Sequence, residues 1–114
     1  MIEAATEIHA PPPRRLTTRE IARTVAAIAR ERPDELVGRS KRRRLATLRW
    51  VVMRIARAEG RSLHQIGRVL GRHQTTVLHG LRASRYLGNR DPARARLIAE
   101  VEAAARQALG REVA

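Results

Sequence analysis

The chain has 114 residues, of which 43% are apolar and 2% aromatic, with no cysteine and a formal net charge of +13. This length suits one domain, and a core almost without aromatic residues must be built from Leu, Ile, Val and Ala, which favours packed helices. The lack of cysteine excludes disulfides, thiolate zinc ligands and a cysteine nucleophile, and no apolar run reaches the ~18 residues that span a bilayer, so we expect a cytoplasmic protein.

The first residues of the chain are expected to form a flexible tail. Residues 1–15 include three consecutive prolines, which favour extended conformations, and they lack the apolar core of a secretion signal. Residues 16–110 form the predicted domain. Its first helix is predicted over 18–31, because Thr17 and Glu20 match a capping box and apolar residues then recur at helical spacing.

A short turn and a long helix are predicted next. Residues 34–38 can form one turn, and the run RSKRRR, residues 39–44, is a basic loop or a helix entrance. Apolar spacing then predicts a helix over 44–59, with Gly60 at the position of a left-handed cap. The same spacing places three arginines on the outside of this helix: Arg49, Arg54 and Arg57.

Two short helices separated by a glycine follow. Ser62 and Gln65 repeat the capping box and open a helix that Gly71 ends, and a second helix then runs through Leu87. Such a pair is typical of a helix-turn-helix. A closing helix over 92–109 either completes the bundle or offers a surface for self-association. The predicted fold is an all-α, compact helical bundle of about five or six helices.

The charge is distributed unevenly along these elements. Residues 1–35 carry six Arg against six acids, and residues 91–114 carry four against four, whereas residues 36–90 carry thirteen Arg and one Lys against the single acid Glu59. A segment of one sign repels itself unless a polyanion neutralises it. The charge therefore indicates a nucleic-acid partner, and a merely solvated cationic face is the alternative.

The second helix of the pair carries polar residues opposite its apolar ones. Val77 and Leu81 face the core, so the ~100° step between residues turns the other side outward. Gln can bond both polar atoms of an adenine edge, a Thr methyl can pack on a thymine methyl, and Arg can bond guanine bidentately. Helix capping is the alternative role for His73 or Thr75. The predicted base contacts in the major groove are Gln74, Thr75, Thr76, His79, His73 and Arg82.

The stretch HQTTVLHG, with SLHQIGRVLGR before it and SKRRR upstream, resembles the C-terminal DNA-binding domain of the bacterial replication initiator DnaA. The signature of that domain reads close to GGRDHTTVLHA, and the similarity covers roughly residues 17–109. The resemblance implies a helical domain whose helix-turn-helix reads a nine-base-pair box, while an arginine of the basic loop enters the minor groove. Thr75, Thr76 and His79 match DNA contacts of that family.

This chain departs from the family signature at three places. One glycine of the GG pair is missing, His73 replaces an acid, and Gln74 replaces the first histidine. The last two changes lie among the base-reading positions and put recognition of the usual box in doubt. Arg43 is favoured for the minor groove. The residues predicted for the minor groove and the DNA backbone are Lys41, Arg42, Arg43, Arg44, Arg49 and Arg72.

Patterns typical of enzymes and metal sites are missing. Residues 36–90 contain no carboxylate pair, and the histidines lack the i, i+4 spacing of a helical zinc site, so we expect no enzyme, no cofactor and no metal. The sequence also lacks the phosphate-binding loop of an ATPase, so a free-standing DNA-binding domain is expected.

The predicted partner is double-stranded DNA, read sequence-specifically. The predicted role is that of a transcription regulator or a modulator of replication initiation at the nucleoid. Two alternatives remain: a basic RNA- or ribosome-associated protein without sequence-specific DNA reading, and a protein-interaction module whose closing helix docks a partner.

Overall fold

The computed structural model describes residues 14–112. Within that range the chain forms six helices and no strand, which confirms an all-α bundle that contains a helix-turn-helix. The helices are α2 (Thr18–Ala29), α3 (Pro33–Leu36), α4 (Arg43–Ala58), α5 (Leu63–Leu70), α6 (Gln74–Arg85) and α7 (Pro92–Ala108).

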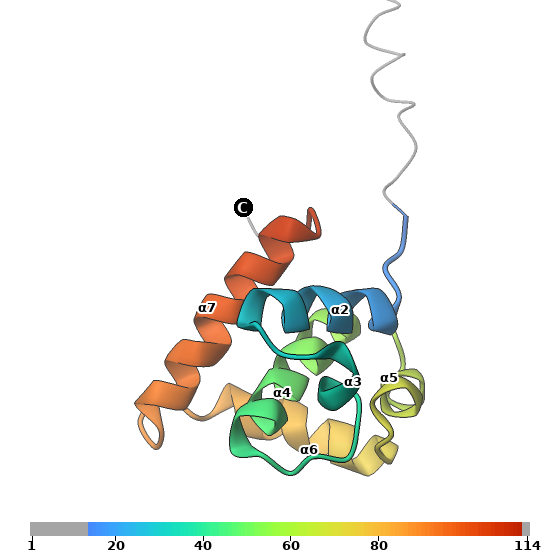
Figure 1. The fold of residues 1–114 in the computed structure, drawn as a ribbon. Helices are drawn as coiled ribbons and strands as arrows, with labels where there is room; N and C mark the ends of the chain where they lie inside the picture. The colour runs from blue at the N-terminus through green and yellow to red at the C-terminus, as the bar shows by residue number, and fades with distance from the viewer. Residues whose placement is uncertain (1–13, 113–114) are drawn as a thin grey trace, which may run out of the picture.

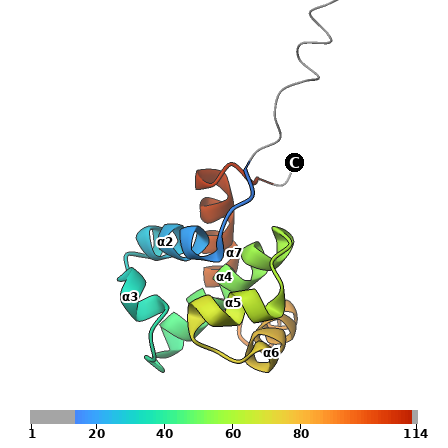
Figure 2. The ribbon, with the colours of Figure 1, turned by 90° about the vertical axis from the view of Figure 1, so that its right-hand side faces the viewer.

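Helix α4 forms the centre of the bundle and packs against each of the other five helices. In Figure 1, α2 crosses above α4, α6 crosses below it, and α7 lies along one side. The view in Figure 2 shows α5 in front of α4, with α6 at the lower end of the molecule. The helix-turn-helix therefore lies along one side of the central helix, with α6 at the lower end of the described molecule.

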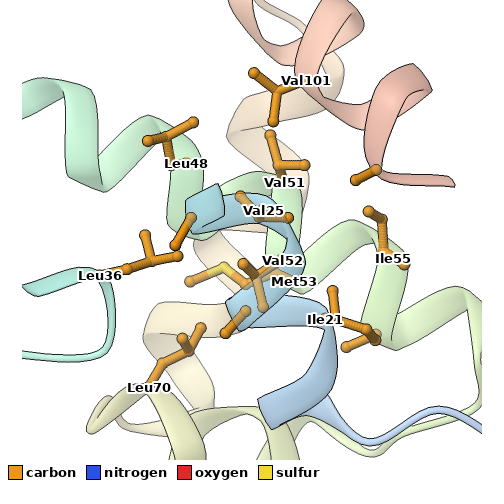
Figure 3. Close-up of a cluster of buried hydrophobic side chains, with 14 of the residues drawn as sticks. Ile21, Val25, Leu36, Leu48, Val51, Val52, Met53, Ile55, Leu70 and Val101 are labelled. Carbon is orange, nitrogen blue, oxygen red and sulfur yellow. The ribbon is translucent and has the colours of Figure 1, made fainter. Parts of the chain in front are cut away.

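The core consists almost entirely of aliphatic side chains, as the composition predicts. Figure 3 shows how side chains from α2, α4, α5 and α7 meet around α4. Burying each such side chain contributes about 1.5–3 kcal/mol to folding. Leu36 from the single turn of α3 is fully buried, so this short helix is anchored to the core. The fully buried aliphatic residues include Ile21, Val25, Leu48, Val51, Val52, Ile55, Leu70 and Val77.

The local signals for helix ends act largely as predicted. Thr17 with Glu20 and Ser62 with Gln65 both form complete capping boxes. The first helix is nevertheless shorter than predicted, because it stops at Ala29 rather than residue 31. Arg30 takes a left-handed conformation with φ of 58°, and its amide N–H donates back to α2.

The two ends of the described chain are tied together. Of the expected tail, only Arg14 and Arg15 lie within the described residues. Arg15 donates hydrogen bonds to the carbonyls of Glu59 and Gly60, and Arg111 donates one to the carbonyl of Arg14. Both tail arginines are exposed but bond to the folded part of the molecule.

The closing helix completes the bundle. Its buried residues Ile98, Val101 and Ala105 face α2 and α4. Asp91 caps its start by accepting a hydrogen bond from the Arg94 amide. None of the helices described is long and apolar enough to cross a membrane.

Candidate nucleic-acid interface

The turn between α5 and α6 is fixed by close backbone contacts. Gly71 ends α5 with φ of 65°, and the Arg72 amide donates a 2.8 Å hydrogen bond to the Gly67 carbonyl. A Cβ on Gly67 would lie only 2.3 Å from the Arg72 carbonyl oxygen. The turn therefore crosses α5 at a position where only glycine leaves room, and this crossing sets the direction of α6.

A second glycine brings α6 against the central helix. A Cβ on Gly80 would lie 2.8 Å from Cδ1 of Trp50 and 2.9 Å from Sδ of Met53. Val77 and Ser84 are buried on the same side of α6. This close approach fixes which side of α6 faces outward.

His73 caps the start of α6. Its Nδ1 accepts a 3.1 Å hydrogen bond from the Thr75 amide and lies 3.0 Å from the Thr75 hydroxyl oxygen. His73 therefore acts as the cap of α6, which was its alternative role in the sequence analysis. Only the other ring nitrogen, Nε2, is left for a contact with DNA.

The predicted base-contacting residues are all exposed on and beside α6. At ~100° per residue, Thr75, His79 and Arg82 lie opposite the buried face, and Gln74 and Thr76 lie on either flank. From Thr75 to Arg82 the outward stripe covers eight residues, or about 10 Å along the helix axis. Tyr86, which the sequence pattern did not single out, continues this stripe four residues after Arg82 and is 68% exposed.

The run at residues 39–44, called the basic segment below, lies beside the helix-turn-helix. Figures 1 and 2 both place the loop between α3 and α4 at the same lower end of the molecule as α6. A guanidinium nitrogen of Arg72, in the turn, donates a 2.8 Å hydrogen bond to the Gly38 carbonyl in that loop. The two elements predicted to contact DNA are therefore neighbours in space.

Acids from outside the basic segment neutralise several of its arginines. Glu31 pairs with both Arg42 and Arg44, and Asp91 pairs with Arg43. The segment is therefore not of one sign in space, contrary to what the distribution along the sequence predicts. The Arg43 side chain remains 72% exposed, and such exposed pairs contribute only about 0–1 kcal/mol.

The region that contains both elements also matches a known protein family. Residues 18–83, which run from α2 to near the end of α6, match the family model described as "Bacterial dnaA protein helix-turn-helix". The chain belongs to this family. No match was found among curated proteins or among solved structures. Membership of the DnaA family implies double-stranded DNA binding, and the exposed stripe on α6 lies within the matched DnaA region.

Arg49 does not lie where the helical spacing predicts. It is only 4% exposed, and its guanidinium donates hydrogen bonds to the carbonyls of Leu36 (2.6 Å), Ser40 (2.8 Å), Glu35 (3.1 Å) and Gly38 (3.2 Å). Each of its three nitrogens is engaged, so the prediction that it contacts the DNA backbone is wrong. Burial lowers the pKa of Arg49, and the nearby charge of Arg72 lowers it further.

Arg72 is also turned toward the protein. It is half-buried, and its guanidinium donates to the carbonyls of Gly38 and Leu70 at 2.8 Å and 2.7 Å. Arg54, expected on the outside, is half-buried and pairs with Glu102, whereas Arg57 is exposed as expected.

Another set of cations, spread over residues 39–90, is exposed and unpaired within residues 14–112. No hydrogen bond or ion pair to a described residue engages their side chains. Of these, only Lys41 and Arg82 were singled out from the sequence, because the net charge alone does not say which cations the protein itself uses. The set is Arg39, Lys41, Arg68, Arg82, Arg85 and Arg90.

No cluster of three or more His, Asp or Glu residues that could hold a metal ion occurs in the part of the chain that the structure describes.

Proposed function

We propose that this chain binds double-stranded DNA sequence-specifically and acts as a transcription regulator or a modulator of replication initiation. One observation carries the proposal: Thr75, His79 and Arg82 share an outward stripe on α6 that has no role in the core. Residues of these types read base edges in the major groove. The regulatory role follows from occupying a DNA site, which excludes or recruits other proteins there.

The residues divide into two groups by the part of DNA they would contact. Gln74, Thr75, Thr76, His79 and Arg82 would contact bases, and His73 would add its Nε2 edge while it caps the helix. Lys41 and the arginines at positions 42–44 would contact the minor groove and the backbone. Arg43 suits the minor groove best, because its side chain is the most exposed of the three.

The test is a selection of bound sequences from a random duplex pool at physiological salt, with the full chain. We expect one short enriched box. Gln74→Ala is then expected to weaken binding to that box by about 1–3 kcal/mol and binding to random duplex by less. Gln107→Ala, an exposed glutamine on α7, is the matched control and should leave both affinities unchanged.

Structured RNA competes in the same assay as the alternative partner. A basic protein that merely coats phosphates would bind both nucleic acids with the same steep salt dependence, and no box would be enriched. That result would contradict sequence-specific DNA reading and favour the RNA-associated role.

A further inference from the structure

We infer that Arg49 and Arg72 are positioning residues that hold the basic segment and the recognition helix at one fixed spacing, which makes the protein selective for the spacing of its contacts on DNA. The inference rests on the proposed function and adds a geometric selectivity to it. It starts from two arginines that the sequence suggested as DNA contacts but that both bond to the protein instead.

The two arginines reach the same stretch of chain from different elements. Arg49 comes from the middle of α4 and binds four carbonyls within residues 35–40. Arg72 comes from the turn of the helix-turn-helix and binds the carbonyl of Gly38, which also accepts from Arg49. One carbonyl therefore joins the central helix, the loop before the basic run and the turn before α6.

The positive charges of Arg49 and Arg72 are compensated by particular carbonyl groups of the protein and not by water alone. Two guanidinium groups converge on one carbonyl, and like charges at close range repel. Carbonyl dipoles compensate both charges through six hydrogen bonds in total: four made by Arg49 and two by Arg72. Charged donors make the stronger kind of hydrogen bond, so the loop is held firmly.

The position of this clamp along the chain links the two surfaces that would contact DNA. Residues 35–40 lead directly into Lys41 and the three arginines that follow. Arg72 directly precedes His73, which caps α6. The far side of the basic segment is anchored too, because Arg44 donates to the Ala29 carbonyl and pairs with Glu31.

A rigid link between two DNA-contacting elements has a predictable consequence. Successive base pairs are about 3.4 Å apart along the duplex, so a site lengthened by one pair moves one contact by that distance relative to the other. A protein with a fixed spacing cannot make both contacts on the longer site. A protein whose loop is free to shift can recover both.

The experiment compares two duplexes with the full chain. The first is the box enriched by selection, and the second carries one extra base pair between the regions that the basic segment and α6 protect in a footprint. The wild-type chain is expected to bind the second duplex about tenfold more weakly, as for a mismatch. Arg72→Ala is expected to bind the first duplex more weakly but to discriminate only about threefold or less between the two.

The control is Arg68→Ala, which removes an exposed arginine of α5 near the same turn and should keep the wild-type discrimination. If Arg72→Ala weakens binding to both duplexes by the same factor, the residue has only a structural role and the inference is wrong. Wild-type binding that tolerates the extra base pair would overturn it as well. If no box is enriched at all, the proposed function fails and the inference falls with it.

A second measurement needs no DNA. Hydrogen exchange of the folded chain should show faster exchange of the hydrogen-bonded amides of Val37, Gly38 and Arg42 in Arg72→Ala, with α2 and α7 unchanged. Unchanged exchange in that loop would show that Arg72 does not hold it, which also overturns the inference.

Discussion

The outward face of α6 and the basic segment at the start of α4 are both polar and exposed, yet their side chains differ in how far the protein itself already binds them. Gln74, Thr76, His79 and Arg82 make no side-chain hydrogen bond or ion pair within residues 14–112. Every arginine of the run 42–44, in contrast, pairs with an acid.

This difference separates the energetic roles of the two surfaces. Contacts made by α6 replace only water, so their full strength is available for distinguishing one base from another. A phosphate contact made by the basic segment must first displace Glu31 or Asp91, which offsets part of the gain. We therefore expect specificity to come from α6 and a smaller, salt-dependent share of affinity from the paired arginines.

The largest effect, a loss of stability, is expected from replacing Arg49, which anchors the loop before the basic segment. Arg49→Met removes the donors for four carbonyls in a buried place, which should lower the free energy of unfolding by about 3 kcal/mol or more. Urea denaturation measures this loss. Arg57→Met is the matched control on the same helix and, being exposed, should change stability by about 0.5 kcal/mol or less. Equal losses of unfolding free energy in both variants would mean that the four hydrogen bonds of Arg49 do not stabilise the fold.

A comparable loss of stability is expected when the turn that directs α6 is crowded. Gly67→Ala places a methyl group against the Arg72 carbonyl, and such overpacking costs about 1–3 kcal/mol. The turn must shift, so binding to the preferred box should weaken more than binding to random duplex. Gly88→Ala is the control, since a Cβ there meets nothing within 4 Å. A Gly67→Ala variant with wild-type stability and specificity would show that the tight crossing does not direct α6.

Features that depend on interactions between near neighbours, such as the ends of α5 and the exposed face of α6, could be predicted from the sequence. Ser62 with Gln65, and Gly71 after them, mark the ends of α5 through interactions between near neighbours, so the order of residues alone locates the helix-turn-helix. The exposed face of α6 followed from helical spacing, because the core lies on one side of that helix.

The burial of Arg49 could not be predicted from helical spacing. Helical spacing places a residue relative to its own helix, and it cannot show that the loop at residues 35–40 returns across the outer side of α4. In the same way, the acids that neutralise the basic segment come from the end of α2 and from the start of α7. Glu31 and Asp91 are distant enough in sequence that a local charge count does not connect them with this segment.

On α6 itself, a single substitution should separate specificity from stability. His79→Ala is expected to weaken binding to the preferred box by about 1–3 kcal/mol, because the exposed imidazole would read a base edge. Its effect on the thermal midpoint should be small. His64→Ala is a matched control, because His64 is an exposed histidine on the partner helix α5. If both variants weaken all sequences alike, α6 is not the surface that reads DNA.

A small gain in DNA affinity is expected when Asp91, the acid that pairs with Arg43, loses its charge. Asp91→Asn can keep the cap on the Arg94 amide but removes the charge that holds Arg43. Affinity for any duplex should rise by about 1 kcal/mol or less, the range of an exposed pair. Glu100→Gln removes an exposed acid of α7 and controls for the change in net charge. An equal gain in both variants would mean that Asp91 does not compete locally with DNA.

The smallest effect should appear when the same pair is titrated in the free protein. The backbone hydrogen bond from Arg94 and the side-chain hydrogen bond from Arg43 lower the pKa of Asp91 below its ordinary value of 3.8. A carboxyl with a lowered pKa stabilises the fold above pH 3.8, and this contribution is lost as the pH falls through the folded-state pKa. The thermal midpoint should therefore fall less steeply below about pH 4 in Asp91→Asn than in the wild type. Glu20, whose pKa is lowered to about 2 by Arg14, titrates in both chains and does not affect the difference. Parallel curves would show that the Asp91 charge adds nothing to the fold, and Arg43 would then be as free for DNA as the residues of α6.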